Sequence, residues 1–173
     1  HTWIGERLTS IILPFEEKFF RDQGVDARFV GHPLAERLAK STPDPRAVAD
    51  LRRVGDPIVA LLPGSRQHVI QSVLPGQLEV AEGIAARFPR AAFIVSAADP
   101  RAAATIRPML ARARAPLHLH EAPYDHLLRA ADLVLVASGT AALEVAFHEK
   151  PMIVMYNASP FFYHLAGRWM LRT

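Results

Sequence analysis

Short apolar runs alternate with longer amphipathic segments along most of the chain. The run Ile-Val-Ala-Leu-Leu at residues 58–62 is apolar without a break, which is typical of a strand covered on both faces in a parallel sheet. The apolar runs predict strands at 10–13, 27–30, 58–62, 92–96, 117–120, 133–137 and 152–155. The segments between them predict helices at 15–23, 33–39, 45–54, 71–88, 101–114, 124–130 and 140–149. This alternation predicts an α/β fold, a Rossmann-like doubly wound parallel sheet with helices on both faces.

Prolines punctuate the pattern, mostly at the ends of the predicted elements. Pro33, Pro45 and Pro123 stand at first helical positions, where a missing backbone N–H costs no hydrogen bond. Pro75 and Pro108 fall inside predicted helices, so each is expected to mark a later helix start or a kink.

One seam divides the chain, at Val-Gly-His-Pro in residues 30–33. Residues 1–32 supply two predicted strands and one helix, which is too little for a core of their own. We expect residues 1–32 to be the tail and linker of a preceding domain, and residues 33–173 to form a second domain. The strongly apolar stretch at 161–171 is an unusual place for a domain to finish, so we expect the sequence to be a piece of a longer protein.

Composition narrows the range of functions. Half of the 173 residues are hydrophobic and 21% are charged, as in a globular protein with a sizeable core. The sequence has no cysteine, which excludes disulfides, thiol nucleophiles and thiolate metal sites. No apolar run approaches the roughly 18–20 residues of a membrane-spanning helix. Apart from Lys18, Lys40 and Lys150 the cations are arginines, scattered along the chain, which argues against a nucleic-acid partner.

The loop after the predicted strand at 58–62 has the residues of an anion site. Ligands of open parallel sheets bind beyond the carboxyl ends of the strands. Gly64 allows close approach of the backbone, Ser65 offers a hydroxyl and an N-cap, and Arg66 supplies a bidentate cation at a helix N-terminus. The pattern favours diphosphate binding, against the alternative of a capped turn with a surface arginine.

A second such loop follows the predicted strand at 133–137. Ser138 and Thr140 are good caps, Gly139 permits a positive φ, and the backbone can cradle a phosphate. Glu144 lies one helical turn further on, where its carboxylate could accept two hydrogen bonds from a ribose. The alternative is a capping arrangement with Glu144 in solvent. Neither loop is a P-loop, and the sequence has no Gly-x-Gly-x-x-Gly, so ordinary ATPase and dinucleotide sites are disfavoured.

The histidines give weaker signals. His118 and His120 share a face of a predicted strand, but no further ligand stands at a metal-binding spacing, so we expect no metal. His32 lies in the seam, where a hinge beside a cleft would bring it near a ligand; a structural role is the alternative.

The order of several motifs resembles that of the lipid-A-disaccharide synthases, which are inverting glycosyltransferases of two-domain GT-B architecture. The shared motifs run through nearly the whole chain: Leu-Pro-Phe-Glu at 13–16, Gly-His-Pro at 31–33, Leu-Leu-Pro-Gly-Ser-Arg at 61–66, Ala-Ser-Gly-Thr-Ala-Ala-Leu-Glu at 137–144 and Lys-Pro-Met-Ile-Val at 150–154. Each motif alone is weak, but together, in this order, they are specific.

The resemblance implies the substrates and the roles of the loops. Such enzymes transfer 2,3-diacylglucosamine from its UDP donor to 2,3-diacylglucosamine 1-phosphate, at the inner face of the bacterial inner membrane. Both loops would face the donor diphosphate and Glu144 would hold the ribose, with no metal or other cofactor. The general base would come from the N-terminal domain, so the chain is expected to bind UDP without transferase activity. One departure is Val69, where the family usually has an acidic residue.

Two points stay open at the level of sequence. The apolar stretch at 161–171, with Phe162 and Trp169, would pack against another domain or a second subunit, or else contact a membrane surface or an acyl chain; the packing role is favoured. Other functions are another UDP-sugar enzyme, of the peptidoglycan transferase or UDP-sugar epimerase type, or a non-catalytic nucleotide-binding module.

Overall fold

The computed structural model of the chain describes residues 9–156, and the chain divides into two units, 1–42 and 43–173. The first unit contains β1 (Thr9–Ile11), α1 (Pro14–Asp22), β2 (Ala27–Phe29) and α2 (Pro33–Ala39). β1 and β2 pair in parallel, with Ile11 opposite Phe29, and α1 connects them. The boundary at residue 32 that we expect from the sequence stays a prediction, as does the stretch at 161–171, which lies outside the described residues.

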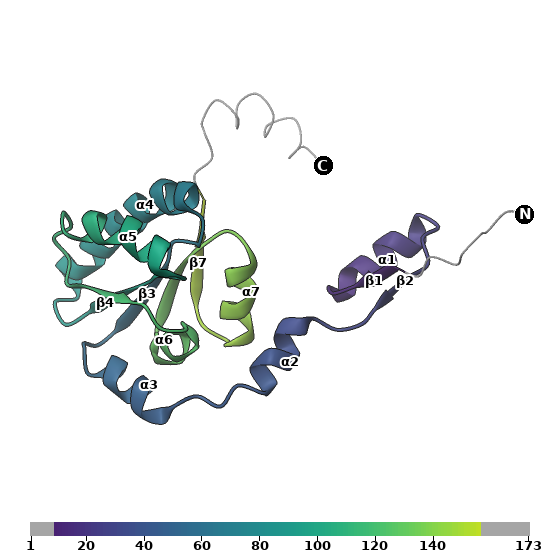
Figure 1. Cartoon of the computed structure of the whole chain (residues 1–173), viewed down its shortest axis with the longest axis horizontal. Coiled ribbons are helices and arrows are strands. Elements are labelled where there is room, and N and C mark those ends of the chain that lie inside the picture. The colour runs from purple at the N-terminus through teal and green to yellow at the C-terminus, as the bar shows by residue number, and fades with distance from the viewer. Residues whose placement is uncertain (1–8, 157–173) are drawn as a thin grey trace, which may run out of the picture. The chain divides into compact units, whose positions relative to one another are not determined.

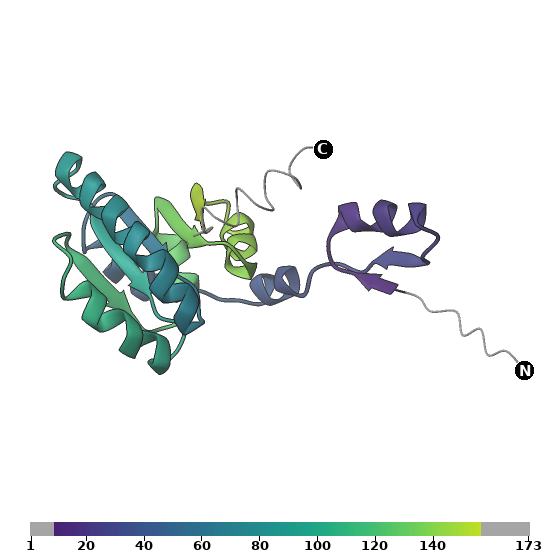
Figure 2. The ribbon, with the colours of Figure 1, turned by 90° about the horizontal axis from the view of Figure 1, so that it is seen from above.

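The second unit is built on a parallel sheet whose strands lie in the order β5-β4-β3-β6-β7. These strands are β3 (Ile58–Leu62), β4 (Ala92–Ser96), β5 (Leu117–His120), β6 (Leu133–Ala137) and β7 (Met152–Met155). The helices are α3 (Pro45–Arg52), α4 (Gln67–Arg87), α5 (Pro100–Leu110), α6 (Asp125–Ala130) and α7 (Thr140–Phe147). They cover both faces of the sheet (Figures 1 and 2), so the predicted Rossmann-like doubly wound α/β fold is confirmed.

The central strand β3 explains why the sheet needs helices on both faces. All five of its residues are buried, and successive side chains point to opposite sides. Val59 and Leu61 belong to the apolar cluster that α4 and α5 complete, whereas Ile58, Ala60 and Leu62 belong to the cluster that includes residues of α6 and α7. The unbroken apolar run in the sequence therefore reflects two separate layers of core.

Neither Pro75 nor Pro108 marks a later helix start, which was one of the two alternatives expected from the sequence. α4 begins at Gln67, four residues before its predicted start, and continues through Pro75. The proline removes one backbone donor, but Ile70 and Leu74 are fully buried and anchor this half of the helix. α5 ends at Leu110 instead of residue 114, with Pro108 in its last turn. At the other elements the predicted and observed ends differ by three residues or fewer.

Asp132 links the amino ends of β3 and β6, at the end of the sheet opposite to the two loops singled out in the sequence. Its carboxylate accepts two hydrogen bonds from Arg52 of α3, at 2.7 and 2.9 Å, and one from the backbone N–H of Ile58, at 2.8 Å. Partial burial acts to raise the pKa of Asp132. The hydrogen bonds from Ile58 and Arg52 outweigh this effect, and the pKa is held below its usual value.

Replacing Asp132 by asparagine is expected to lower the free energy of unfolding by about 1 kcal/mol at neutral pH, because a partly exposed ion pair is lost. A carboxyl group with a depressed pKa in the folded state stabilises the fold above its unfolded pKa, and this contribution is lost as the pH falls below about 4. Urea unfolding of both proteins at pH 7 and near pH 3 should therefore show a difference that narrows in acid. A difference that stays constant would contradict this account.

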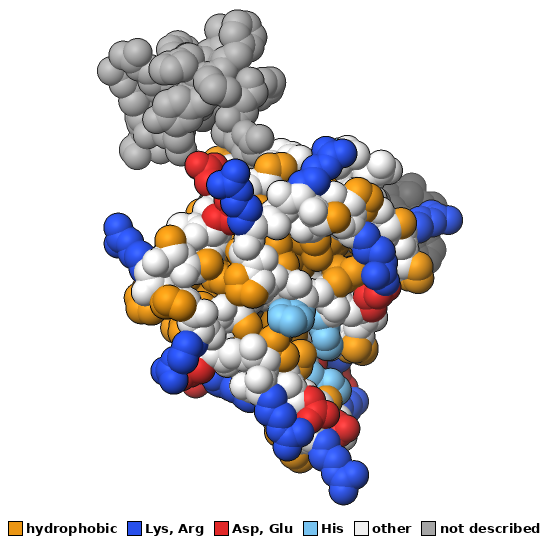
Figure 3. All heavy atoms as spheres, turned by 90° about the vertical axis from the view of Figure 1, so that its left-hand side faces the viewer, with side chains coloured by type: hydrophobic (Ala, Val, Ile, Leu, Met, Phe, Trp, Pro, Cys, Tyr) orange, Lys and Arg blue, Asp and Glu red, His pale blue; other side chains and the backbone are white. Residues whose placement is uncertain are grey.

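Positive side chains are dispersed over the face of the molecule shown in Figure 3, on which arginine and lysine do not gather into one patch. This dispersion matches the scattered positions of arginine in the sequence. Within residues 9–156, no helix is both long and apolar enough to cross a membrane.

Candidate functional site

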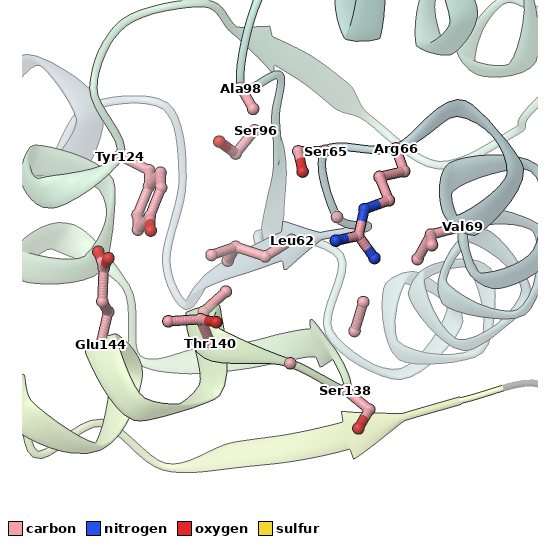
Figure 4. A pocket seen from close by; sticks show the side chains of 14 residues that line it. Leu62, Ser65, Arg66, Val69, Ser96, Ala98, Tyr124, Ser138, Thr140 and Glu144 are labelled. Atoms are coloured by element: carbon pink, nitrogen blue, oxygen red, sulfur yellow. The ribbon is translucent and has the colours of Figure 1, made fainter. Parts of the chain in front are cut away.

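A pocket of about 350 Å³ opens at the carboxyl ends of β3 and β6, the two strands between which the strand order reverses. Such a reversal is where open α/β sheets bind their ligands. The pocket brings together residues from both loops singled out in the sequence (Figure 4). It is lined by Gly64, Ser65, Arg66, Ser138, Gly139, Thr140 and Glu144, together with residues that the sequence analysis did not select.

The first loop turns sharply at Gly64. Its φ of +101° is a conformation that side-chain-bearing residues rarely adopt, and a Cβ at this position would lie 2.9 Å from Cγ1 of Val69. Val69 itself lines the pocket. The residue that departs from the family pattern is therefore an apolar side chain close behind the loop, and it adds no negative charge beside Arg66.

Arg66 stands at the N-cap position of α4 and is exposed. Its side chain reaches into the pocket from the start of the helix (Figure 4). Among residues 9–156, its guanidinium has no carboxylate partner, and the first turn of α4 contains no acidic residue. A guanidinium and the N–H groups of a helix N-terminus thus point at the same space, which favours an anion.

The second loop ends at Gly139, which has a φ of +148° and stands at the N-cap position of α7. The sequence analysis expected Ser65, Ser138 and Thr140 to serve as caps, and this expectation was wrong, since Arg66 and Gly139 occupy the two N-cap positions. Neither residue has a side-chain acceptor. In α2, α3 and α5, by contrast, a side chain accepts a hydrogen bond from a first-turn N–H. In α4 and α7, no side chain caps the first-turn N–H groups that face the pocket.

Tyr124 and Glu144 lie at one end of the pocket, and Arg66 lies at the other (Figure 4). Both residues at the first end are half-buried. The pocket therefore combines an acceptor and an aromatic ring at one end with a cation at the other. A nucleoside diphosphate has the matching order of groups: a base and ribose diol, followed by two phosphates.

Tyr124, Ser96 and Ala98 are pocket residues that sequence reasoning missed. Ser96 ends β4, Ala98 follows two residues later, and Tyr124 lies in the loop after β5. The rule that ligands bind at the carboxyl ends of strands points to all three. The loops that carry these three residues contain no glycine-rich motif, so the sequence pattern alone did not indicate them.

Two residues that follow α7 contact α6, the helix that begins next to Tyr124. His148, directly after α7, places its Nε2 3.0 Å from Oδ1 of Asp125, the first residue of α6. Burial lowers the pKa of His148 and outweighs the opposing effect of the Asp125 charge. At the other end of α6, the Lys150 ammonium donates to the carbonyl oxygens of Arg129 and Ala131, at 3.1 and 3.0 Å.

The histidines singled out in the sequence lie elsewhere. His32 belongs to the first unit, where its Nδ1 accepts a hydrogen bond of 3.1 Å from the N–H of Leu34 and caps α2. His118 and His120 lie on the edge strand β5. In the described part of the chain, no three His, Asp or Glu side chains come together as metal ligands. A cleft role for His32 stays a prediction.

The strand order and the pocket at the reversal point are those of a Rossmann-like domain, as in one half of a GT-B glycosyltransferase. Comparison with known proteins then identifies the family. Residues 6–171 match the family model described as lipid-A-disaccharide synthetase, and the chain belongs to this family.

Curated relatives agree with this assignment. The chain is 37% identical over 164 residues to the lipid-A-disaccharide synthase of Pseudomonas putida, and 39% identical over 156 residues to that of Anaeromyxobacter dehalogenans. These matches cover 95% and 90% of the chain, but only 44% and 41% of the relatives. The chain therefore spans less than half the length of the curated relatives it matches.

Proposed function

We propose that the chain provides the sugar-donor half of a lipid-A-disaccharide synthase. The whole enzyme would transfer 2,3-diacylglucosamine from its UDP donor to 2,3-diacylglucosamine 1-phosphate. The observation that carries the proposal is the pocket at the β3–β6 reversal. It gathers the expected diphosphate-binding residues of both loops with Glu144: Gly64, Ser65, Arg66, Ser138, Gly139 and Thr140. The family match favours this function over another UDP-sugar enzyme or a non-catalytic nucleotide-binding module.

In this proposal the leaving group is UDP, and the pocket stabilises its charge. Arg66 and the first-turn N–H groups of α4 and α7 would hold the diphosphate, which accumulates negative charge as the glycosidic bond to the sugar breaks. Glu144 would accept hydrogen bonds from the ribose hydroxyls, and Tyr124 would pack against the nucleoside. No metal is required, because the guanidinium and the helix N-termini supply the positive potential.

The remaining steps belong to parts of the enzyme other than this pocket. We expect the general base that deprotonates the acceptor hydroxyl to come from the N-terminal domain, so the chain alone would bind UDP without forming disaccharide. From the family to which the chain belongs we infer that the whole enzyme works at the inner face of the bacterial inner membrane. Self-association of the whole enzyme is a further expectation of the same kind.

The test is calorimetric titration of the chain with UDP, with UMP and ADP as controls. UDP is expected to bind more tightly than either control, because UMP lacks one phosphate and ADP presents a different base. Glu144→Ala is expected to weaken UDP binding about tenfold, since charge-assisted hydrogen bonds to the ribose are lost.

A deoxyribose ligand provides the matched control for this variant. 2′-Deoxy-UDP lacks one of the two hydroxyls, so Glu144→Ala should weaken its binding by a smaller factor. If Glu144→Ala affects UDP and 2′-deoxy-UDP equally, Glu144 is not the ribose ligand. A folded chain that does not bind UDP would overturn the proposed function itself.

A further inference from the structure

Gln77 is a polar residue in an apolar position. It lies in the middle of α4, is 0% exposed, and follows Ile70, Val73 and Leu74 on the buried stripe of that helix. A buried amide is costly unless its polar atoms are hydrogen-bonded. Its partners are backbone groups of the sheet, which places the amide between α4 and the strands below it.

The amide of Gln77 joins two strands at once. Its Nε2 donates to the carbonyl oxygen of Leu135 in β6, at 3.0 Å, and to that of Leu62 in β3, at 3.4 Å. Leu62 is the last residue of β3, and Leu135 lies two residues before the end of β6. Both carbonyls thus stand directly below the loops that line the pocket.

The other half of the amide has no partner. Among the described residues, Oε1 of Gln77 accepts no hydrogen bond although it is buried. An apolar side chain of similar size would avoid this cost, so stability alone does not account for a glutamine here. The donor end, in contrast, is fully used, with one N–H available for each strand.

We propose that Gln77 is a positioning residue that fixes the separation of the two phosphate-binding loops. The inference rests on the proposed function, because it assigns both loops to one diphosphate. A diphosphate must meet the β3 loop and the β6 loop together, so the distance between the strand ends decides how well both sets of N–H groups reach it. A nucleoside monophosphate has one phosphate fewer to place and depends less on this distance.

The variants Gln77→Leu and Gln77→Met remove the donor and keep an apolar group of similar length. We expect both to fold, and to lower the preference for UDP over UMP, expressed as the ratio of the two Kd values, by about five- to tenfold. Ile84→Ala is the control, because it removes apolar packing from the same helix two turns further from the pocket. The Kd ratio is insensitive to a general loss of folded protein, since both nucleotides bind the same folded fraction.

Backbone amide hydrogen exchange separates failure of this inference from failure of the proposed function. Exchange in residues 64–66 and 138–140 should be faster in both Gln77 variants than in Ile84→Ala, with no ligand present. If the wild-type chain binds UDP but the Kd ratio and the exchange are unchanged in the Gln77 variants, Gln77 does not position the loops. If the wild-type chain shows no preference for UDP, the proposed function fails and the exchange alone decides: equal exchange in all variants overturns the positioning role.

Discussion

Arg66→Ala is expected to weaken UDP binding by about fiftyfold, the largest loss expected when a side chain of the pocket is truncated to alanine. Arg66 reaches into the pocket without a carboxylate partner in residues 9–156, so its full charge is available to a diphosphate. A charge-assisted hydrogen bond between a guanidinium and a phosphate contributes about 1.5–3 kcal/mol, which is a factor of about 10–150 in Kd. Calorimetric titration with UDP at constant ionic strength measures the loss.

Arg87→Ala is the matched control, since Arg87 is also exposed and ends the same helix at its far end. It should leave the Kd for UDP within about twofold of wild type. Arg66→Ala should also reduce the dependence of UDP binding on salt, because fewer charges meet in the complex. Equal effects of the two substitutions would show that Arg66 acts only through the general charge of the chain.

Gly64→Ala is expected to lower the free energy of unfolding by about 1–3 kcal/mol and to abolish measurable UDP binding. At a φ of +101°, a residue with a Cβ is strained, and the Cβ would approach Cγ1 of Val69 to 2.9 Å. Relief of this contact moves the backbone that carries Ser65 and Arg66. Chemical unfolding and UDP titration of the same preparation measure both effects.

Gly83→Ala is a control in which the added Cβ causes no steric contact. Gly83 lies inside α4, and a Cβ there would meet no atom within 4 Å. Alanine should therefore stabilise the fold by up to about 1 kcal/mol and leave UDP binding unchanged. Adding Val69→Ala to Gly64→Ala removes the steric contact but not the backbone strain. Full recovery of UDP binding in that double variant would show that the unusual φ at Gly64 is unimportant.

The fold was predictable because the apolar runs, the amphipathic segments and the turn residues all indicate alternating strands and helices. β3 is predicted with its observed bounds, since a run of five apolar residues fits only a strand covered on both faces. The start of α4 was not: the helix begins four residues before the predicted start, after Arg66, which forms no side-chain cap, and it continues through Pro75. A proline removes one hydrogen bond, whereas tertiary burial acts along the whole helix.

The pocket was predictable where residue type and position coincide. Gly64 and Arg66 belong to the loop after β3, and Glu144 lies in the helix that follows the loop after β6; the structure brings all three into one pocket. Tyr124 has the position without a motif, so it was missed. Gln77 has neither a motif nor a place at a strand end. In the sequence, only its position on the apolar stripe of a helix distinguishes it from a solvent-exposed glutamine. Its partners are backbone carbonyls of strands far apart in the chain, which no local pattern encodes.

The order of the strands has a consequence for how the site forms during folding. β3 receives β4 on one side early in the chain, but its other neighbour, β6, is supplied only after β4, α5, β5 and α6 have followed. The two halves of the pocket are therefore joined by a contact of long sequence separation, which forms slowly because the intervening chain must first be ordered. No intermediate without β6 contains the pocket. A nucleotide that occupies it binds only chains in which the central pairing is complete, and so stabilises the assembled sheet instead of one loop.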